Sequence, residues 1–190
     1  SIYNGKMLGT FFNRHPNGVP DKRTDLYYIQ SADFGETWTT ADGIKLKLPL
    51  LKKENPARII DYASLRKNIY MKDMEFDADG NPSCLYIRSN GHEPGSKSAP
   101  YEWCITSWNG KKWQTNVVTT SDHNYDMGSL YIEKNDWKII GPTENGPQKW
   151  GVGGELAIWK SIDKGNTWEN MKIVTKNSEF SHSYVRKPVN

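Results

Sequence analysis

The sequence predicts an all-β protein made of four-stranded antiparallel sheets that follow one another along the chain. Three observations support this prediction. An eight-residue motif occurs twice, Asp-Gly and Asn-Gly pairs separate short runs of strand-forming residues, and no apolar stripe with the period of a helix is present. The spacing of these signals fits about three such sheets into the 190 residues.

The repeated motif reads S-x-D-x-G-x-T-W and covers residues 31–38 and 161–168. Each copy follows a run of strand-forming residues. The Asp can accept backbone N–H bonds within a tight turn, the Gly permits a positive φ, and the Trp can pack between neighbouring sheets. A motif that recurs at the same place in the strand pattern indicates an array of similar units. We expect both copies to build the fold rather than to touch a substrate.

A degenerate third copy at residues 106–113 keeps the Gly and the final Trp, with Asn109 available for the turn. We expect a first unit at about 1–50 that lacks its inner strand, a second at 51–120, a third at 121–178, and the inner strand of a fourth within 179–190. The expected strands are 6–13, 25–31, 37–48, 69–77, 83–88, 102–108, 113–119, 128–133, 137–141, 155–161, 167–175 and 184–188.

The composition suits many short strands and gives no sign of a nucleic-acid or membrane partner. The chain has eight Trp, ten Tyr and five Phe, together with sixteen Gly and ten Pro. The net charge is only +3 and the basic residues are scattered, so nucleic acid is not expected as a partner. No stretch approaches the roughly 18–20 apolar residues of a membrane helix.

The two cysteines, Cys84 and Cys104, fall on consecutive strands of the second unit. A disulfide requires a register that makes them neighbours, and two buried free thiols fit the pattern at least as well. Neither the His nor the Cys residues show metal-ligand spacing. The sequence therefore predicts no metal site and no cofactor. A bound calcium ion is compatible with the chain, but no motif indicates one.

The repeated motif resembles the Asp-box of sialidase-type β-propellers, where it forms the turn between the third and fourth strands of a blade. Longer segments resemble the BNR-4 family of sialidase-superfamily propellers, and the segment that contains His123 is the most specific of them. The resemblance implies a β-propeller of four-stranded antiparallel blades with Asp-box turns, of which about three are present. The segments are 9–16, 22–28, 37–43, 119–131 and 183–189.

The resemblance also implies where the protein acts and which class of substrate it acts on. The family is found mostly in bacteria that degrade polysaccharides, and related propellers include ulvan lyases and rhamnosyl-glucuronate-cleaving enzymes. We therefore expect a secreted or periplasmic protein that acts on an acidic polysaccharide or oligosaccharide containing uronate or rhamnose. Propellers need about four to eight blades to close a ring. Three blades leave sheet edges open, so we expect the remaining blades to come from another chain or segment.

One face of a propeller carries the connections from strand two to strand three and from strand four to the next inner strand. All four histidines fall in such connections, so they share the face that surrounds the central funnel. The candidate catalytic residues on this face are His123, Tyr125, His15 and Arg23. The candidate substrate-binding residues are His182, Tyr184, Arg186, Asp126, His92 and Trp150.

These residue types supply the functions that a uronate lyase needs. Arg can hold the uronate carboxylate through two parallel bonds, whereas His and Tyr can move the C5 proton and protonate the leaving oxygen. Trp150 lies among glycines and could stack on a sugar ring. Each residue also has a structural interpretation, because it could cap a loop or fill the gap between two blades.

Other functions stay open at this stage. A glycoside hydrolase needs two carboxylates, for which Asp126, Glu144 and Glu155 are candidates on the same face. Arg23 and Arg186 could belong to a sialidase arginine cluster, but the Arg-Ile-Pro motif of those enzymes is absent. A non-catalytic carbohydrate-binding propeller and a protein-interaction module are the remaining alternatives.

Overall fold

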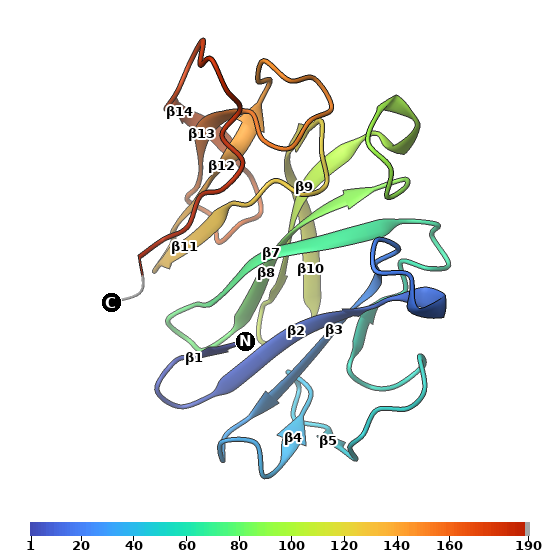
Figure 1. The fold of residues 1–190 in the computed structure, drawn as a ribbon. Coiled ribbons are helices and arrows are strands. Elements are labelled where there is room, and N and C mark those ends of the chain that lie inside the picture. Colours follow the sequence, from blue (N-terminus) through green and yellow to red (C-terminus); the bar gives the residue numbers. More distant parts are fainter. Residues whose placement is uncertain (189–190) are drawn as a thin grey trace.

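The computed structural model describes residues 1–188 and consists of three antiparallel sheets side by side (Figure 1). Apart from one short strand of the first sheet, the strands within each sheet follow chain order, as a meander does. Within the described residues, no helix is long and apolar enough to cross a membrane.

The first sheet has the order β1-β2-β3-β4-β5, and β6 pairs with β3 off this path. The short 3-10 helix η1 (Pro16–Gly18) lies in the connection between β2 and β3. Of the six strands, only β2 and β3 are long. The strands are β1 (Ile2–Tyr3), β2 (Leu8–Arg14), β3 (Thr24–Ser31), β4 (Trp38–Thr39), β5 (Lys45–Leu46) and β6 (Arg58–Ile60).

The second and third sheets have four strands each, in the orders β10-β9-β8-β7 and β11-β12-β13-β14. A second 3-10 helix, η2 (Ser96–Ser98), lies between β8 and β9. The second sheet contains β7 (Asn68–Phe76), β8 (Pro82–Ser89), β9 (Tyr101–Trp108) and β10 (Trp113–Ser121). The third contains β11 (Ser129–Glu133), β12 (Asp136–Glu144), β13 (Glu155–Ser161) and β14 (Glu169–Ile173).

The structure differs from the expected strands in four places. The two-residue β1 pairs with β2 at the inner position that the first unit was expected to lack. The expected strand 37–48 is two strands, because a turn at Asp42 and Gly43 separates β4 from β5. Strand β6 was not expected. The strand expected at 184–188 is absent from the described residues, where Tyr184 forms only an isolated bridge with Met127, and 189–190 lie outside them.

The two S-x-D-x-G-x-T-W turns have the same hydrogen bonds, as their residue types predict. In the second copy, Asp163 Oδ1 accepts the backbone N–H of Thr167 at 2.9 Å and Asp163 Oδ2 accepts its hydroxyl at 2.7 Å. The Trp168 indole donates to the carbonyl of Gly165 at 3.1 Å. The first copy repeats these bonds from residue 31 to residue 38. Both motifs are therefore structural turns that join the third strand of a sheet to the fourth.

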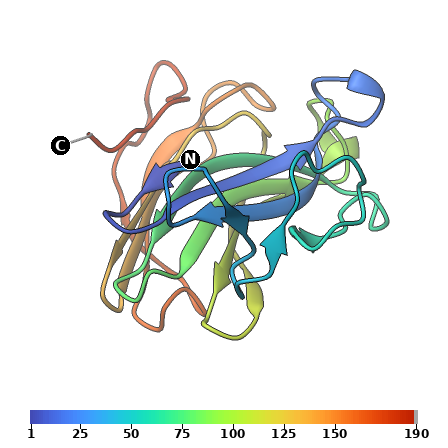
Figure 2. The same ribbon diagram turned by 90° about the horizontal axis from the view of Figure 1, so that it is seen from below.

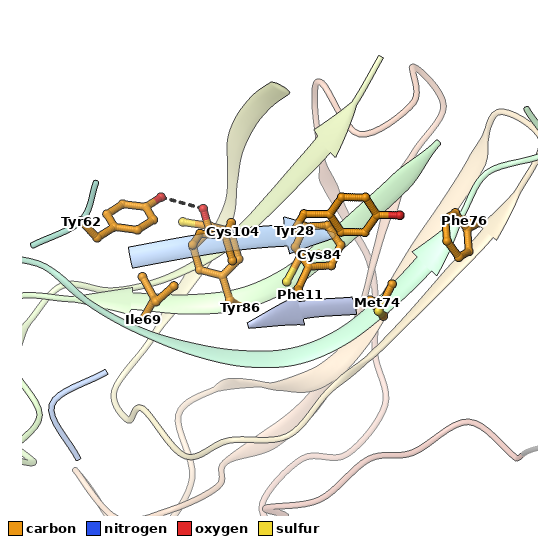
Figure 3. Packing of buried hydrophobic residues seen from close by; sticks show 10 residues of the cluster. Phe11, Tyr28, Tyr62, Ile69, Met74, Phe76, Cys84, Tyr86 and Cys104 are labelled. Carbon is orange, nitrogen blue, oxygen red and sulfur yellow. Dashed lines mark hydrogen bonds between the residues drawn. The ribbon is translucent and has the colours of Figure 1, made fainter. Parts of the chain in front are cut away.

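Two apolar cores hold the sheets together, one on each side of the second sheet. The core that contains Phe11, Tyr28, Ile69 and Tyr86 joins the first sheet to the second (Figure 3). The other centres on the fully buried Trp103 and joins the second sheet to the third. A β-carbon at Gly128 or Gly141 would lie within 2.8 Å of this indole, so close packing of the sheets requires glycine at both positions.

The first core also contains a chain of hydroxyl groups. Tyr62 and Tyr86 are joined at 2.7 Å (Figure 3), Tyr86 reaches Thr106 at 2.8 Å, and Thr106 reaches Thr115 at 2.8 Å. These bonds satisfy polar atoms that burial would otherwise leave without a partner. Cys84 and Cys104 are both buried free thiols, so the disulfide alternative is wrong.

Candidate functional site

The connections between strands gather at one end of the sheets, where the sequence analysis placed the site. The β2–β3 and β8–β9 connections lie on the same side of the molecule in both views (Figure 1, Figure 2). Residues 122–126, between β10 and β11, form hydrogen bonds to the β8–β9 connection and to the β12–β13 connection. Asn124 donates to the carbonyl of Gly91 at 3.0 Å, and Asp122 accepts the backbone N–H of Trp150 at 2.9 Å.

Tyr125 is the most highly connected of the candidate catalytic residues. Its half-buried phenol donates to Asp21 Oδ1 at 2.5 Å. Its ring packs edge-to-face on Tyr70 of β7, with centroids 5.2 Å apart, and the Tyr70 hydroxyl donates to the backbone carbonyl of Asp21 at 2.6 Å. Burial and the Asp21 carboxylate both raise the pKa of Tyr125. A phenol bonded to a carboxylate is a plausible proton-transfer group.

Arg23 lies over the rings of these two tyrosines. Its guanidinium carbon is 5.4 Å from the ring centre of Tyr70 and 5.8 Å from that of Tyr125, which are cation–π distances. Its Nε donates to the carbonyl of Pro20 at 3.0 Å. No carboxylate within residues 1–188 forms an ion pair with Arg23. The terminal nitrogens of Arg23 can therefore donate hydrogen bonds to an external anion.

His123 is held in one tautomer by the loop that carries it. Its Nδ1 accepts the backbone N–H of Tyr125 at 3.0 Å, so a neutral imidazole keeps its proton on Nε2. The side chain is only 4% exposed. Burial is the largest cause that lowers the pKa of His123, and the Lys72 cation adds to it against the opposing effect of Asp122. Both the loop geometry and the surroundings therefore favour the neutral form.

Asp126 is fully buried at the end of the same loop. Its Oδ1 accepts the backbone N–H of Gly153 at 2.6 Å, and its Oδ2 accepts the Ser121 hydroxyl at 3.3 Å. Burial raises the pKa of Asp126 to about 7, against the lowering effect of the Gly153 bond and of Lys72. Asp126 thus joins the loop to the β12–β13 connection and has no exposed oxygen for a substrate.

His182 lies apart from this cluster, next to the third sheet. Its Nε2 is 3.0 Å from the Ser178 hydroxyl, which also bonds to the Glu155 carboxylate at 2.9 Å. Glu155 accepts two more bonds, from the backbone N–H of Ser178 and from the Thr175 hydroxyl, and these hydrogen bonds lower its pKa. This group holds residues 175–182 against the start of β13.

Tyr184 and Arg186 lie together further along the chain. Arg186 Nε donates to the Tyr184 hydroxyl at 3.1 Å, and the guanidinium lies 5.5 Å from the ring centre. Tyr184 is 64% exposed. Arg186 also lines a cavity of about 970 Å³ beside the inner strands, together with Lys72, Asp73 and Ser129. Whether these residues bind substrate stays a prediction.

Three further candidates lie outside the tyrosine cluster. His15 is exposed at the start of η1, and His92 lies half-buried in the β8–β9 connection. No side-chain contact within residues 1–188 joins either imidazole to Tyr125. Trp150 is half-buried and packs beside Tyr101, with ring centres 6.2 Å apart, at the edge of the second core. Packing accounts for most of its surface, and stacking on a sugar stays a prediction.

The sequence analysis missed Asp21, Tyr70 and Lys72. Asp21 belongs to no motif, and Tyr70 and Lys72 belong to the strand expected at 69–77. Asp21 lies in the β2–β3 connection and Tyr70 lies near the start of β7, at the end of the sheets that carries the connections, and this position is a signal for both. Lys72 lies in the middle of β7, where its position in the strand does not indicate a role in the site. Within the part of the chain that the structure describes, no His, Cys, Asp and Glu cluster could hold a metal ion.

The fold and its turns define a class of all-β protein built from repeated antiparallel sheets. A family model described as "BNR repeat-containing family member" (BNR_4) matches residues 2–121, which is more than half of the chain, and the chain belongs to that family. None of the curated proteins matches the chain.

Among the solved structures that resemble the chain are two PL25 polysaccharide lyases described as ulvan lyases. One, bound to -[GlcA(1-4)Rha3S]-, has a TM-score of 0.63 and 17% identity, and the match covers 92% of this chain and 41% of that chain. The other has a TM-score of 0.57 and 19% identity, with 81% of this chain and 34% of that chain covered. The likeness is one of fold, and this chain spans less than half of their length.

Proposed function

We propose that this chain carries part of the active site of an enzyme that cleaves an acidic, uronate-containing polysaccharide by β-elimination. The observation that carries the proposal is Arg23, a guanidinium with no carboxylate partner within residues 1–188. It lies over Tyr125, whose phenol is bonded to Asp21. This arrangement offers a cation for a substrate carboxylate next to a group that can move a proton. The ulvan lyases of similar fold support the substrate class, because one of them was solved with a glucuronate-containing oligosaccharide.

In this proposal, Arg23 binds the uronate carboxylate and neutralises its charge. Its planar guanidinium can hold the uronate carboxylate through two parallel hydrogen bonds. Neutralising the carboxylate makes the adjacent C5 proton more acidic, because the negative charge that develops on removal of this proton is delocalised onto the carboxylate group. The tyrosine rings below the guanidinium fix its plane, and the bond from its Nε to Pro20 fixes its position along the loop.

Tyr125 moves the proton. As Asp21 accepts the phenol proton, the phenol oxygen removes the C5 proton of the uronate. The C4–O bond then breaks, its electron pair leaves with the glycosidic oxygen, and Tyr125 returns a proton to that oxygen. The products are a C4=C5 unsaturated uronate at one new end and a hydroxyl group at the other. Asp21, at 2.5 Å from the phenol, is well placed to exchange the proton at each step.

His123 has a positioning role in this proposal, rather than the catalytic role that the sequence analysis assigned to it. Its Nδ1 lone pair is occupied by the backbone N–H of Tyr125, and the ring is buried. An imidazole in this state cannot accept the C5 proton without breaking the bond that holds the loop. His123 instead fixes the backbone of the residue that performs the transfer, with the two ring centres 5.5 Å apart.

Hydrolysis has less support. A glycoside hydrolase needs two carboxylates with room for the sugar between them. Asp126 and Glu155 are buried and already accept hydrogen bonds from the protein. Binding without cleavage is the second candidate function, because Arg23 and the tyrosines would also bind a uronate that is not processed.

The assembly of the remaining blades and the location of the protein belong to the same proposal. Three meanders in succession, each with a similar turn before its fourth strand, are what three neighbouring blades of a propeller would contribute. The other blades would then come from another segment or chain. A polysaccharide too large to enter a cell requires an enzyme outside the cytoplasm, so we infer secretion or export to the periplasm of a bacterium.

Replacement of Arg23 tests the proposal. We expect Arg23→Ala and Arg23→Lys to lower kcat/KM on a uronate polysaccharide by about a hundredfold or more, because neither can bind the carboxylate through two bonds. Lys22→Ala removes an exposed charge next to Arg23 and is the matched control. Activity of Arg23→Ala close to that of the wild type would refute the assignment. Circular dichroism of each variant checks that the fold is retained.

A further inference from the structure

The candidate site rests on a buried lysine that no sequence motif indicates. Lys72 is 6% exposed and lies in the middle of β7, which crosses the molecule between the first and third sheets (Figure 1). Lysine is rarely buried to this extent unless its ammonium group has partners. Its position in the strand is also unusual. Met71 pairs with Tyr86 and Asp73 pairs with Leu85, so Lys72 is the additional residue of a β-bulge.

The bulge directs Lys72 toward the loop at 122–126. A bulge leaves one residue unpaired and changes the direction of its side chain. The Lys72 ammonium group donates to the backbone carbonyl of Asn124, and it lies 5.8 Å from the ring centre of Tyr70. Asn124 stands between His123 and Tyr125 in the sequence. Lys72 therefore contacts both the loop that carries Tyr125 and the tyrosine on which Tyr125 packs.

Charged and titratable groups surround the ammonium group on three sides. Arg23 precedes β3, Tyr70 belongs to β7, and His123 and Asp126 belong to the loop. Lys72 opposes protonation of His123 and favours the carboxylate form of Asp126. Burial lowers the pKa of Lys72 itself to about 7, with Arg23 adding to the effect and Asp126 opposing it.

We propose that Lys72 is a positioning residue for the elimination reaction. It fixes Tyr125 by holding the Asn124 carbonyl and the Tyr70 ring. This inference rests on the proposed function and extends it to a residue that touches neither substrate nor product. Two neighbouring bonds complete the arrangement. The Asn124 amide is held by Gly91, and the backbone N–H of Tyr125 is held by His123. Lys72 thus adds a hydrogen bond from β7 to the backbone of this loop, beside the ring contact that Tyr70 of the same strand makes with Tyr125.

Lys72→Met tests the proposal, because Met fills a similar volume and removes the donor and the charge. We expect kcat to fall by about tenfold to a hundredfold, with a smaller change in KM, because a displaced Tyr125 affects the reaction step more than the binding of the carboxylate by Arg23. Lys187→Met is the matched control. Lys187 lines the same cavity and pairs with Glu75, but it has no bond to the loop.

A titration of the histidines provides a second measurement that does not depend on catalysis. In nuclear magnetic resonance, the His123 ring of Lys72→Met should titrate at higher pH than in the wild type, because the nearby cation is gone. The other three histidines, which have no hydrogen bond to Lys72, serve as internal references. Lys72→Arg, which keeps the charge, should leave the His123 titration close to that of the wild type.

The two measurements separate this inference from the proposed function. If the wild type forms no unsaturated uronate, the proposed function fails, and the His123 titration still decides whether Lys72 controls the loop. An unchanged His123 titration in Lys72→Met, or an unchanged kcat in an active protein, would overturn the role of Lys72. Thermal unfolding of the variant shows that each comparison is made between folded proteins.

Discussion

At the scale of residues, four side chains from distant parts of the sequence create the candidate site. Arg23 and Asp21 come from the β2–β3 connection, Tyr70 comes from β7, and Tyr125 comes from the loop before β11. Each depends on the others, because the phenol needs Asp21 for its proton and the guanidinium needs the two rings to fix its plane. The chemistry is therefore a property of the group rather than of any single residue.

The Tyr125 phenol should be required for the reaction but not for binding. We expect Tyr125→Phe to lower kcat by about a hundredfold to ten-thousandfold, the usual contribution of a positioned proton-transfer group, and to leave KM nearly unchanged. Steady-state kinetics on a uronate polysaccharide measures both. Tyr3→Phe, at an exposed tyrosine that packs on Phe34, is the control. A variant that raises KM and keeps kcat would show that Tyr125 only binds the sugar.

The buried pair Lys72 and Asp126 should make the stability of the fold depend on pH. Burial raises the pKa of Asp126 to about 7, so from about pH 4 to 7 the folded protein retains a proton that the unfolded chain has released, and stability falls as pH rises. Burial lowers the pKa of Lys72 to about 7. Above this pH the unfolded chain holds the additional proton, and stability rises again.

The double variant Lys72→Met/Asp126→Asn removes both titrations. The quantity of interest is the free energy of unfolding of the variant minus that of the wild type at the same pH. We expect this difference to be greatest near pH 7, where it should exceed the differences near pH 4 and pH 10 by on the order of a few kcal/mol. Urea unfolding across this pH range measures the difference. A difference that does not vary with pH would show that the two groups keep their ordinary pKa values in the folded protein.

At the scale of elements, the two S-x-D-x-G-x-T-W turns have similar bonds but different neighbours. Gly35 and Gly165 both have a positive φ, at 102° and 82°. A β-carbon at Gly165 would lie 2.8 Å from the Trp137 ring, whereas one at Gly35 would meet only Trp38 at an ordinary 3.6 Å. The second turn is therefore packed against the preceding hairpin, and the first is more open.

This difference predicts unequal effects of the same substitution. Gly35→Ala should cost about 1–2 kcal/mol, because an L-residue is strained at a positive φ. Gly165→Ala carries that cost and also displaces Trp137, which adds about 1–3 kcal/mol. Chemical denaturation of the two variants gives the comparison. Equal losses would mean that Trp137 moves aside without cost.

Most of the elements could be predicted from the sequence, because turn motifs and strand propensities are local. The eight strands of the second and third sheets lie within a few residues of their expected positions. The errors come from tertiary pairing. Strand β6 forms because β3 has a free edge beside β4. The chain at 184–188 forms only an isolated bridge between Tyr184 and Met127 instead of a strand.

The candidate site was predicted in part for the same reason. His123, Tyr125, Arg23 and Asp126 were identified from their connections, which the strand pattern locates. The roles within the group depend on contacts between residues 47 or more positions apart, and a sequence pattern does not contain such contacts. Asp21 bonds to Tyr125 across 104 positions and Lys72 bonds to Asn124 across 52. Such partners become visible only when the sheets are assembled.

At the scale of the whole molecule, the three sheets form a support for loops that meet at one end. The two cores fix the angle between neighbouring sheets, and buried residues such as Trp103 hold the second sheet against the third. Because β7 belongs to the second sheet and the β2–β3 connection to the first, the packing of these sheets sets the distance between Tyr70 and Arg23. Function in this account is a consequence of how the sheets pack.

The most direct test of the central claim is the chemical nature of the new chain ends. The protein is incubated with uronate-containing polysaccharides in water enriched in heavy oxygen, and the products are analysed by mass spectrometry. Elimination predicts C4=C5 unsaturated uronate ends that contain no heavy oxygen. Saturated ends, with one heavy oxygen incorporated at the new reducing end for each bond cleaved, would show hydrolysis and would contradict elimination. An uncleaved polymer would contradict the enzyme assignment.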